Sequence, residues 1–111
     1  MTGDHLVVIS TTDSAEEAES LSKLIVAARL AACVQISSPI RSIYRWEGAV
    51  QDGQEWQLWI KTTGDRLAEL TEFINQNHSY DTPEIVALPI LGGNPAYLQW
   101  MTDETRSAVE S

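Results

Sequence analysis

Three residues that can bind metals or transfer protons lie close together in the stretch NHSYDTPEIVALPI, residues 77–90: His78, Asp81 and Glu84. An imidazole and two carboxylates could ligate a divalent cation or work as an acid–base set. The same stretch could instead be a helix end, a turn and the start of a strand. The chain has two histidines and one cysteine, so few other positions could host such chemistry.

A metal site in this stretch depends on His78. Copper favours imidazole and sulfur ligands, whereas Asp81 and Glu84 suit harder cations. One histidine with two carboxylates at irregular spacing is a weak signal for any metal. Within one subunit we therefore favour the structural alternative, in which a cationic His78 complements the dipole at a helix C-terminus. A neighbouring subunit could still add ligands, so His78 remains the candidate metal ligand.

The segment 34–63 supplies a second candidate site. Its aromatic rings could stack on a planar ligand, although aromatic residues on paired strands more often belong to a core or an interface. Lys61, together with Arg41 or Arg45, could instead hold an anion in a cleft between subunits. The residues that we expect in such a cleft are Tyr44, Trp46, Glu55, Lys61, Tyr80 and Glu84.

Catalytic motifs are missing from the sequence: it has no nucleophile elbow, HExxH, P-loop or GxGxxG. Cys33 lies at an expected helix-to-strand junction without a nearby base, so we expect a buried structural thiol. Gly92-Gly93, just before a helix start at Asn94, is only a weak anion-binding signal. We predict that the protein is not an enzyme and requires no cofactor, with Cu²⁺ as a possible ligand.

Composition narrows the partners and the compartment. The 111 residues fit one domain, 1–111, and 16 acidic against 7 basic residues give a net charge of −9. Such a surface repels nucleic acid and anionic membranes, so we expect neither as a partner. The N-terminus lacks the features of a signal peptide, no apolar run is long enough to span a membrane, and a single cysteine fits a reducing compartment. We expect a cytoplasmic protein.

The N-terminal third predicts a strand followed by a helix. The apolar, β-branched run at 5–12 is typical of a buried strand. In the helical segment 13–31, Ser14 and Glu17 have the spacing of a capping box. The buried stripe of this helix is expected to contain Leu21, Leu24, Ile25 and Ala28.

The next segments predict a long hairpin. Apolar residues alternate from Val34 to Trp46, which indicates one strand with a single apolar face. Pro39 must lie at an edge, a bend or a bulge, because it has no backbone N–H. The partner strand is 55–63. A turn at Gly48 would use both strands fully, so we prefer it and assign Asp52-Gly53 to a bulge.

The remaining elements complete the fold class. Asp65 can cap a helix over 65–78, with Leu67, Leu70 and Ile74 buried. A fourth strand follows at 83–90, and a short helix begins at Pro95. The order is strand, helix, strand, strand, helix, strand and short helix. This order predicts an α+β fold, the ferredoxin-like sandwich, with a long central hairpin.

The hairpin 34–63 is longer than the first and last strands, so part of it must project beyond the sheet. That part carries several large apolar side chains: Tyr44, Trp46, Val50 and Trp56. Exposed strands with such residues are usually covered by another chain. We therefore predict a homo-oligomer that pairs these hairpins between subunits.

Taken together, the chain resembles the CutA family of divalent-cation tolerance proteins. Its motifs AACVQIS, SIYRWEG, EWQLWIKTT, HSYDTPEIVALPI and GNPAYLQW occur in matching order, and the resemblance extends roughly from residue 5 to residue 105. It implies a ferredoxin-like homotrimer and, in bacteria, a cytosolic protein linked to tolerance of copper and other divalent metals.

The resemblance leaves the molecular activity open. We predict a non-enzymatic trimer associated with divalent-metal tolerance that binds metal weakly. Because the CutA trimer resembles the PII signalling proteins, the first alternative is a sensor of a small anionic or nucleotide ligand in the cleft between subunits. The second alternative is a stable scaffold for another protein.

Three positions depart from the family pattern. Members with a proposed copper site resemble one another in a cysteine at the end of the first strand, where this chain has Ser10. Asn77 replaces the first of two adjacent histidines, and Ser79 replaces the commoner proline of HPY. Only His78 carries over as a ligand, so the resemblance implies a weakened copper site here.

Overall fold

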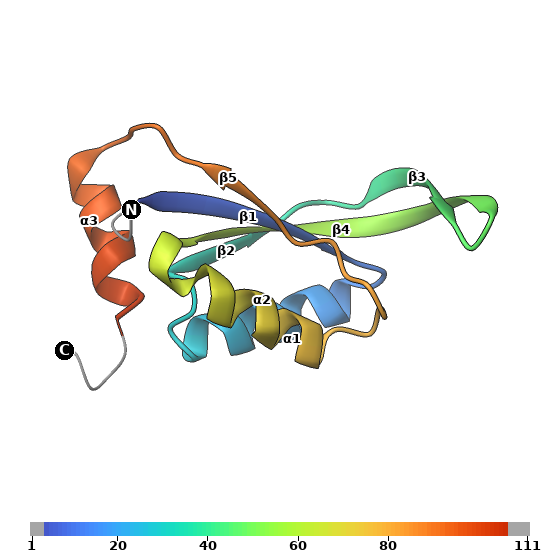
Figure 1. The fold of residues 1–111 in the computed structure, drawn as a ribbon, viewed down its shortest axis with the longest axis horizontal. Coiled ribbons are helices and arrows are strands. Elements are labelled where there is room, and N and C mark those ends of the chain that lie inside the picture. Colours follow the sequence, from blue (N-terminus) through green and yellow to red (C-terminus); the bar gives the residue numbers. More distant parts are fainter. Residues whose placement is uncertain (1–3, 107–111) are drawn as a thin grey trace.

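β1 (His5–Thr12) and β4 (Ala49–Thr63) pair at the centre of an antiparallel sheet in the computed structural model, which describes residues 4–106. The sheet has the order β2-β4-β1-β5, and β3 pairs with the far part of β4. Two helices cover one face, and a third lies at one end (Figure 1). The other elements are α1 (Ala15–Ala27), β2 (Cys33–Ile36), β3 (Ile40–Trp46), a 3₁₀ turn (Gly64–Arg66), α2 (Leu67–Asn77), β5 (Val86–Pro89) and α3 (Pro95–Glu104).

The core lies between the sheet and helices α1 and α2. Alternate residues of the central strands point into it, including the fully buried Val8, Leu58 and Ile60. From α2, Leu70 and Ile74 are buried as expected. The stripe predicted for α1 was partly wrong, because Leu24 and Ala28 are exposed. The buried residues of α1 are Ala18, Leu21, Ser22 and Ile25.

Two of the three N-cap residues predicted from the sequence cap their helices in the structure. The Ser14 hydroxyl accepts a hydrogen bond from the Glu17 N–H at 3.1 Å, and Asn94 caps α3 through the N–H of Ala96. Asp65 was wrongly expected to cap α2. Its carboxylate instead binds Arg106, whose guanidinium lowers the pKa of Asp65 to about 2. A 3₁₀ turn precedes α2, which begins without a side-chain cap.

The long hairpin turns at Glu47-Gly48, as predicted. Both residues have positive φ, 51° and 80°, which a tight two-residue hairpin turn requires. Beyond the end of β1, the paired β3 and β4 project away from the rest of the molecule (Figure 1).

The last strand, β5, is shorter than expected. It pairs only with β1, so Pro89 lies on an edge strand, where its missing N–H is tolerated.

The bulge lies at Ser37–Pro39, not at Asp52-Gly53. Ile36 pairs with Leu58 and Ile40 with Glu55, so three residues oppose two. Ser37 closes the gap, because its N–H donates to the Gln57 carbonyl at 2.9 Å and its hydroxyl accepts the Gln57 N–H at 3.0 Å. The extra residue reverses the alternation, so the single apolar face expected from Val34 to Trp46 was wrong.

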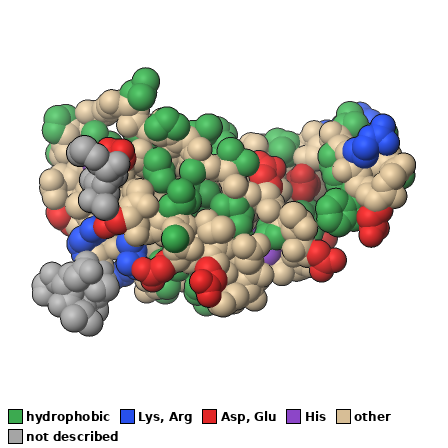
Figure 2. All heavy atoms as spheres, in the orientation of Figure 1, with side chains coloured by type: hydrophobic (Ala, Val, Ile, Leu, Met, Phe, Trp, Pro, Cys, Tyr) green, Lys and Arg blue, Asp and Glu red, His purple; other side chains and the backbone are tan. Residues whose placement is uncertain are grey.

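The sheet face opposite α1 and α2, called here the open face, carries apolar side chains without a covering helix. It is formed by Val7, Ile9, Trp59, Val86 and Leu88, of which the last three are more than a third exposed. Hydrophobic side chains gather along β1 and β5 in Figure 2. Within residues 4–106, no helix is long and apolar enough to cross a membrane.

A first prediction concerns Ser10, which is fully buried on the core side and whose hydroxyl has no hydrogen-bond partner among the described residues. Because an unpaired buried hydroxyl is unfavourable, Ser10→Ala should raise the free energy of unfolding by up to about 1 kcal/mol in urea titrations. The matched control is Thr62→Val. It removes the hydroxyl that donates to the Leu30 carbonyl at 2.7 Å and should lower stability by about 1–3 kcal/mol. Equal losses in both variants would contradict the prediction.

Candidate functional site

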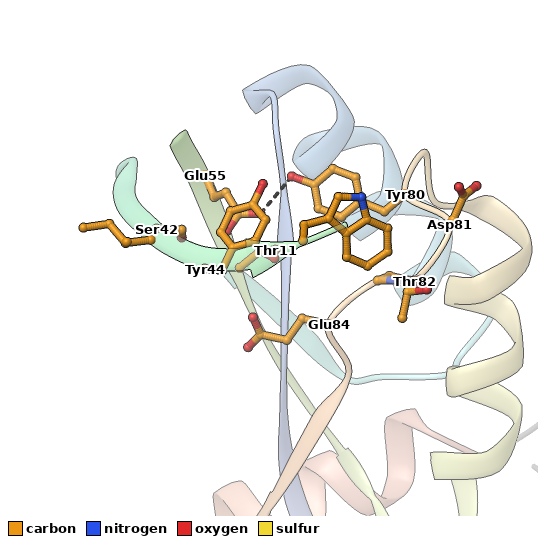
Figure 3. A pocket seen from close by; sticks show the side chains of 11 residues that line it. Thr11, Ser42, Tyr44, Glu55, Tyr80, Asp81, Thr82 and Glu84 are labelled. Carbon is orange, nitrogen blue, oxygen red and sulfur yellow. Dashed lines mark hydrogen bonds between the residues drawn. The ribbon is translucent and has the colours of Figure 1, made fainter. Parts of the chain in front are cut away.

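A cavity of about 630 Å³ opens where the projecting hairpin joins the body of the molecule. Its walls come from β3, β4, the end of β1 and the loop between α2 and β5 (Figure 3). Five of the six residues that we expected in a cleft line this cavity: Tyr44, Trp46, Glu55, Tyr80 and Glu84. The sixth, Lys61, does not.

The bulge of the hairpin determines which side chains face the cavity. In β3, Ser42, Tyr44 and Trp46 share one face, and their partners on β4 share it with Glu55. Arg41 and Arg45 alternate with them and therefore point to the opposite face. Arg41 is held there by Asp52, with N–O distances of 2.9 and 2.6 Å. The structure thus does not bring either arginine to Lys61.

The loop that forms the other wall is fixed through His78. The Nε2 atom of His78 lies 2.7 Å from the Thr11 carbonyl oxygen, and Nδ1 accepts the Tyr80 N–H at 3.0 Å. This pattern requires the neutral tautomer with the proton on Nε2. A carboxylate oxygen of Glu17 lies 3.6 Å from Nδ1, but the bond from Tyr80 needs that lone pair. Both ring nitrogens of His78 therefore serve as structural links, one to β1 and one to the backbone of Tyr80.

Glu17 fastens the same loop to α1. Its two carboxylate oxygens accept hydrogen bonds from the N–H and the hydroxyl of Ser79, both at 2.8 Å. The serine that departs from the commoner HPY motif thus has a local role, since proline could supply neither donor. The loop is tied to α1 by Ser79 and to β1 by His78.

Tyr80 connects the loop to the hairpin. Its hydroxyl donates to a carboxylate oxygen of Glu55 at 2.8 Å, the bond drawn in Figure 3. Burial and the neighbouring Glu55 raise the pKa of Tyr80 well above its usual value, so the phenol keeps its proton. One oxygen of Glu55 is thereby occupied by a fixed donor.

Glu84 is the second carboxylate of the cavity. Burial and the proximity of Glu55 raise its pKa. In the described part of the chain, neither Glu55 nor Glu84 forms an ion pair with a lysine or an arginine. Among residues 4–106, no basic side chain lines the cavity. The cavity therefore carries negative charge that no described lysine or arginine neutralises.

The residues that suggested a metal site do not converge. His78 is inaccessible and has both nitrogens in hydrogen bonds, and the side chain of Asp81 points away from the cavity (Figure 3). Ser10 faces the core. Across residues 4–106, no group of three or more His, Cys, Asp or Glu residues is arranged to hold a metal ion. The described side chains of this chain alone therefore do not form a metal centre.

Lys61 and Cys33 are register partners on the open face, away from the cavity. The Lys61 Nζ lies 3.5 Å from the Tyr97 hydroxyl and 5.4 Å from the centre of its ring. Cys33 is half-buried rather than fully buried.

Sequence reasoning missed the cavity residues Thr11, Ser42 and Thr82, because no local motif marks them and only strand pairing and the loop path bring them together.

A family profile described as "CutA1 divalent ion tolerance protein" matches residues 6–104 of this chain. The chloroplastic protein CutA of Arabidopsis thaliana is 47% identical over 102 residues, which are 92% of this chain and 56% of that protein. The divalent-cation tolerance protein CutA of Thermus thermophilus is 46% identical over 99 residues, 89% and 96% of the two chains. This chain spans little more than half the length of the plant relatives.

Solved structures agree with these matches. The crystal structure of CutA1 from Oryza sativa has a TM-score of 0.90 at 46% identity and covers 93% of this chain and 94% of its own. The structure described as the periplasmic divalent cation tolerance protein CutA from Archaeoglobus fulgidus has a TM-score of 0.88 at 36% identity and covers 92% and 99%. The family resemblance of the sequence is confirmed.

The raised pKa of Glu84 yields a second prediction. A carboxyl whose pKa is higher in the folded protein favours folding at low pH and loses that advantage as the pH rises through the folded pKa. Glu84→Gln should therefore be more stable than the parent at pH 7, by less than about 1 kcal/mol because the side chain is largely exposed. In urea titrations the difference should vanish below about pH 4. A constant difference from pH 3 to pH 8 would show that charge is not the cause.

Proposed function

Because this chain belongs to the CutA1 family of divalent-ion tolerance proteins, we propose that it is a non-enzymatic, trimeric binding protein that serves cation tolerance through a ligand bound in its cavity. The observation that carries this proposal is the chemistry of the cavity walls. They present aromatic rings and carboxylates without a basic partner, while both nitrogens of the nearby His78 ring form structural hydrogen bonds.

Metal binding in this proposal is weak. The accessible oxygen ligands are the carboxylates of Glu55 and Glu84, and one oxygen of Glu55 already accepts the Tyr80 hydroxyl. Copper favours nitrogen and sulfur ligands, which the cavity does not offer. We propose that Cu²⁺ or another divalent ion binds tightly only if a neighbouring subunit adds ligands.

A third prediction tests this role of the metal. Titration of Cu²⁺ into the protein by calorimetry should give a shallow isotherm, because two carboxylates and no imidazole face the cavity. Glu84→Gln should reduce the heat further. His78→Gln, whose amide retains a donor and an acceptor for the loop, should leave the heat unchanged. If a folded His78→Gln protein loses all Cu²⁺ heat, then His78 is a ligand and the proposal is wrong.

We propose a ferredoxin-like subunit assembled as a homotrimer. The strand order β2-β4-β1-β5 with two helices on one face supports the first part. The uncovered apolar open face and the exposed Ile43 and Val50 of the projecting hairpin support assembly, because monomers rarely leave such surfaces in water. Solved relatives of high similarity share the fold of the subunit.

A fourth prediction concerns this assembly. Light scattering should give three times the 12.3 kDa mass of one chain. Trp59→Asp places a charge at the centre of the open face and should shift the mass toward that of a single chain, because burying an unpaired carboxylate is strongly unfavourable. Lys23→Glu, a charge change on the exposed side of α1, should leave the mass unchanged. A parent protein that scatters as one chain would refute the trimer.

The runner-up is a PII-like sensor of a small anion or nucleotide in the cytoplasm. A single feature favours it, the Lys61 ammonium beside the Tyr97 ring on the open face, where a trimer would place a neighbour. Thermal-shift measurements with nucleotides and organic anions test this alternative. Stabilisation that disappears in Lys61→Met would support it.

A further inference from the structure

We propose that the cavity at the base of the hairpin binds a small organic cation, a primary or quaternary ammonium compound, between its aromatic rings and its two carboxylates. The inference rests on the proposed role as a binding protein and gives the chemical class of the ligand. This ligand differs from the anion that the sequence suggested, because Lys61, on which an anion site would depend, lies outside the cavity.

Charge is the first argument. Glu55 and Glu84 line the same cavity, where burial and the charge of Glu55 raise the pKa of Glu84, and no lysine or arginine within residues 4–106 lines it. The strand alternation that brings Tyr44 and Trp46 to this wall directs Arg41 and Arg45 to the other face of the hairpin. An anion would meet only like charge here. A cation would relieve the repulsion between the two carboxylates.

The aromatic walls are the second argument. Tyr44, Trp46 and Tyr80 come from two separate segments and surround the same space as the carboxylates. The faces of such rings attract ammonium groups, and carboxylates supply the complementary charge. Tyr80 is held in place by Glu55 at 2.8 Å, and its backbone is held by His78 at 3.0 Å. This wall is therefore formed before any ligand arrives.

The size of the cavity favours an organic cation over a bare metal ion. A volume of about 630 Å³ lies in the range of small-molecule sites, roughly 300–1,000 Å³. A divalent ion needs several oxygen ligands within a short radius. The cavity offers two carboxylates, one of them engaged by Tyr80, together with apolar surface that a metal ion cannot use.

Choline and 3,3-dimethylbutan-1-ol test the proposal, because the alcohol has the shape of choline without its charge. Calorimetry or chemical-shift titration of the full chain should detect choline and give at least tenfold weaker binding for the alcohol. Glu84→Gln should weaken choline binding about five- to tenfold, and Trp46→Leu by a similar factor through the lost cation–π contact. Tyr80→Phe retains the ring, so a smaller loss is expected.

Asp81→Asn is the matched control. It removes the same charge from a residue at the cavity rim whose side chain points away from the interior (Figure 3). Choline affinity should change less than about twofold, which corresponds to a few tenths of a kcal/mol. Equal losses in Asp81→Asn and Glu84→Gln would mean that choline responds only to the net charge of −9, and would overturn the proposal.

Other results also decide the matter. Equal affinity for choline and the alcohol, or no binding of either at millimolar concentration, would overturn the inference. Failure here is distinguishable from failure of the proposed function, because the trimer and the Cu²⁺ titration are measured without an organic ligand. A trimer that binds Cu²⁺ weakly and ignores choline would leave the proposed function standing and refute only the organic cation.

Discussion

The bulge at Ser37–Pro39, closed by the hydrogen bonds of Ser37, determines which face of the sheet each side chain of β3 occupies. Proline cannot extend the ladder, so one extra residue is accommodated between Ile36 and Ile40, and the side chains of β3 change faces. Without that extra residue, Tyr44 and Trp46 would lie on the face of Leu58 and Ile60, in line with the core. With it, they lie beside Glu55 and meet the loop that carries Tyr80. The hairpin wall of the cavity and the position of the arginines on the opposite face follow from this one irregularity.

The second wall shows how a buried histidine can serve a site without chemistry of its own. His78 uses one ring nitrogen on β1 and the other on the backbone of Tyr80, while Glu17 binds Ser79 from α1. These bonds hold the loop so that Tyr80 and Glu84 can face the hairpin. The arrangement keeps two carboxylates in one cavity, although burial and the charge of Glu55 raise the pKa of Glu84.

Local signals predicted the elements well, because capping, periodicity and turn chemistry depend on neighbours in the sequence. Ser14, Asn94 and Gly48 are examples. Predictions from local signals were wrong where the outcome depended on distant residues. Asp65 binds Arg106 instead of capping α2, and the one-residue shift at Ser37 reversed the faces of β3. Five residues of the cavity were foreseen, but Thr11, Ser42 and Thr82 were not, and neither was its charge. Only strand pairing separates Lys61 from Glu55 and directs Arg41 to Asp52.

The Tyr80–Glu55 bond joins a fixed loop to an arm that extends beyond the sheet. The cavity therefore lies at a joint, with one wall on the body of the subunit and the other at the root of the arm. A ligand bound there would contact both walls and restrict the motion of the hairpin relative to the sheet. Without the ligand, the hairpin would be held by the continuity of β4 and by the hydrogen bond of the Tyr80 hydroxyl. In an assembly in which neighbouring chains contacted the projecting hairpins, a ligand bound in the cavity would reduce the motion of the chains relative to one another. Such a signal needs no rearrangement of the core.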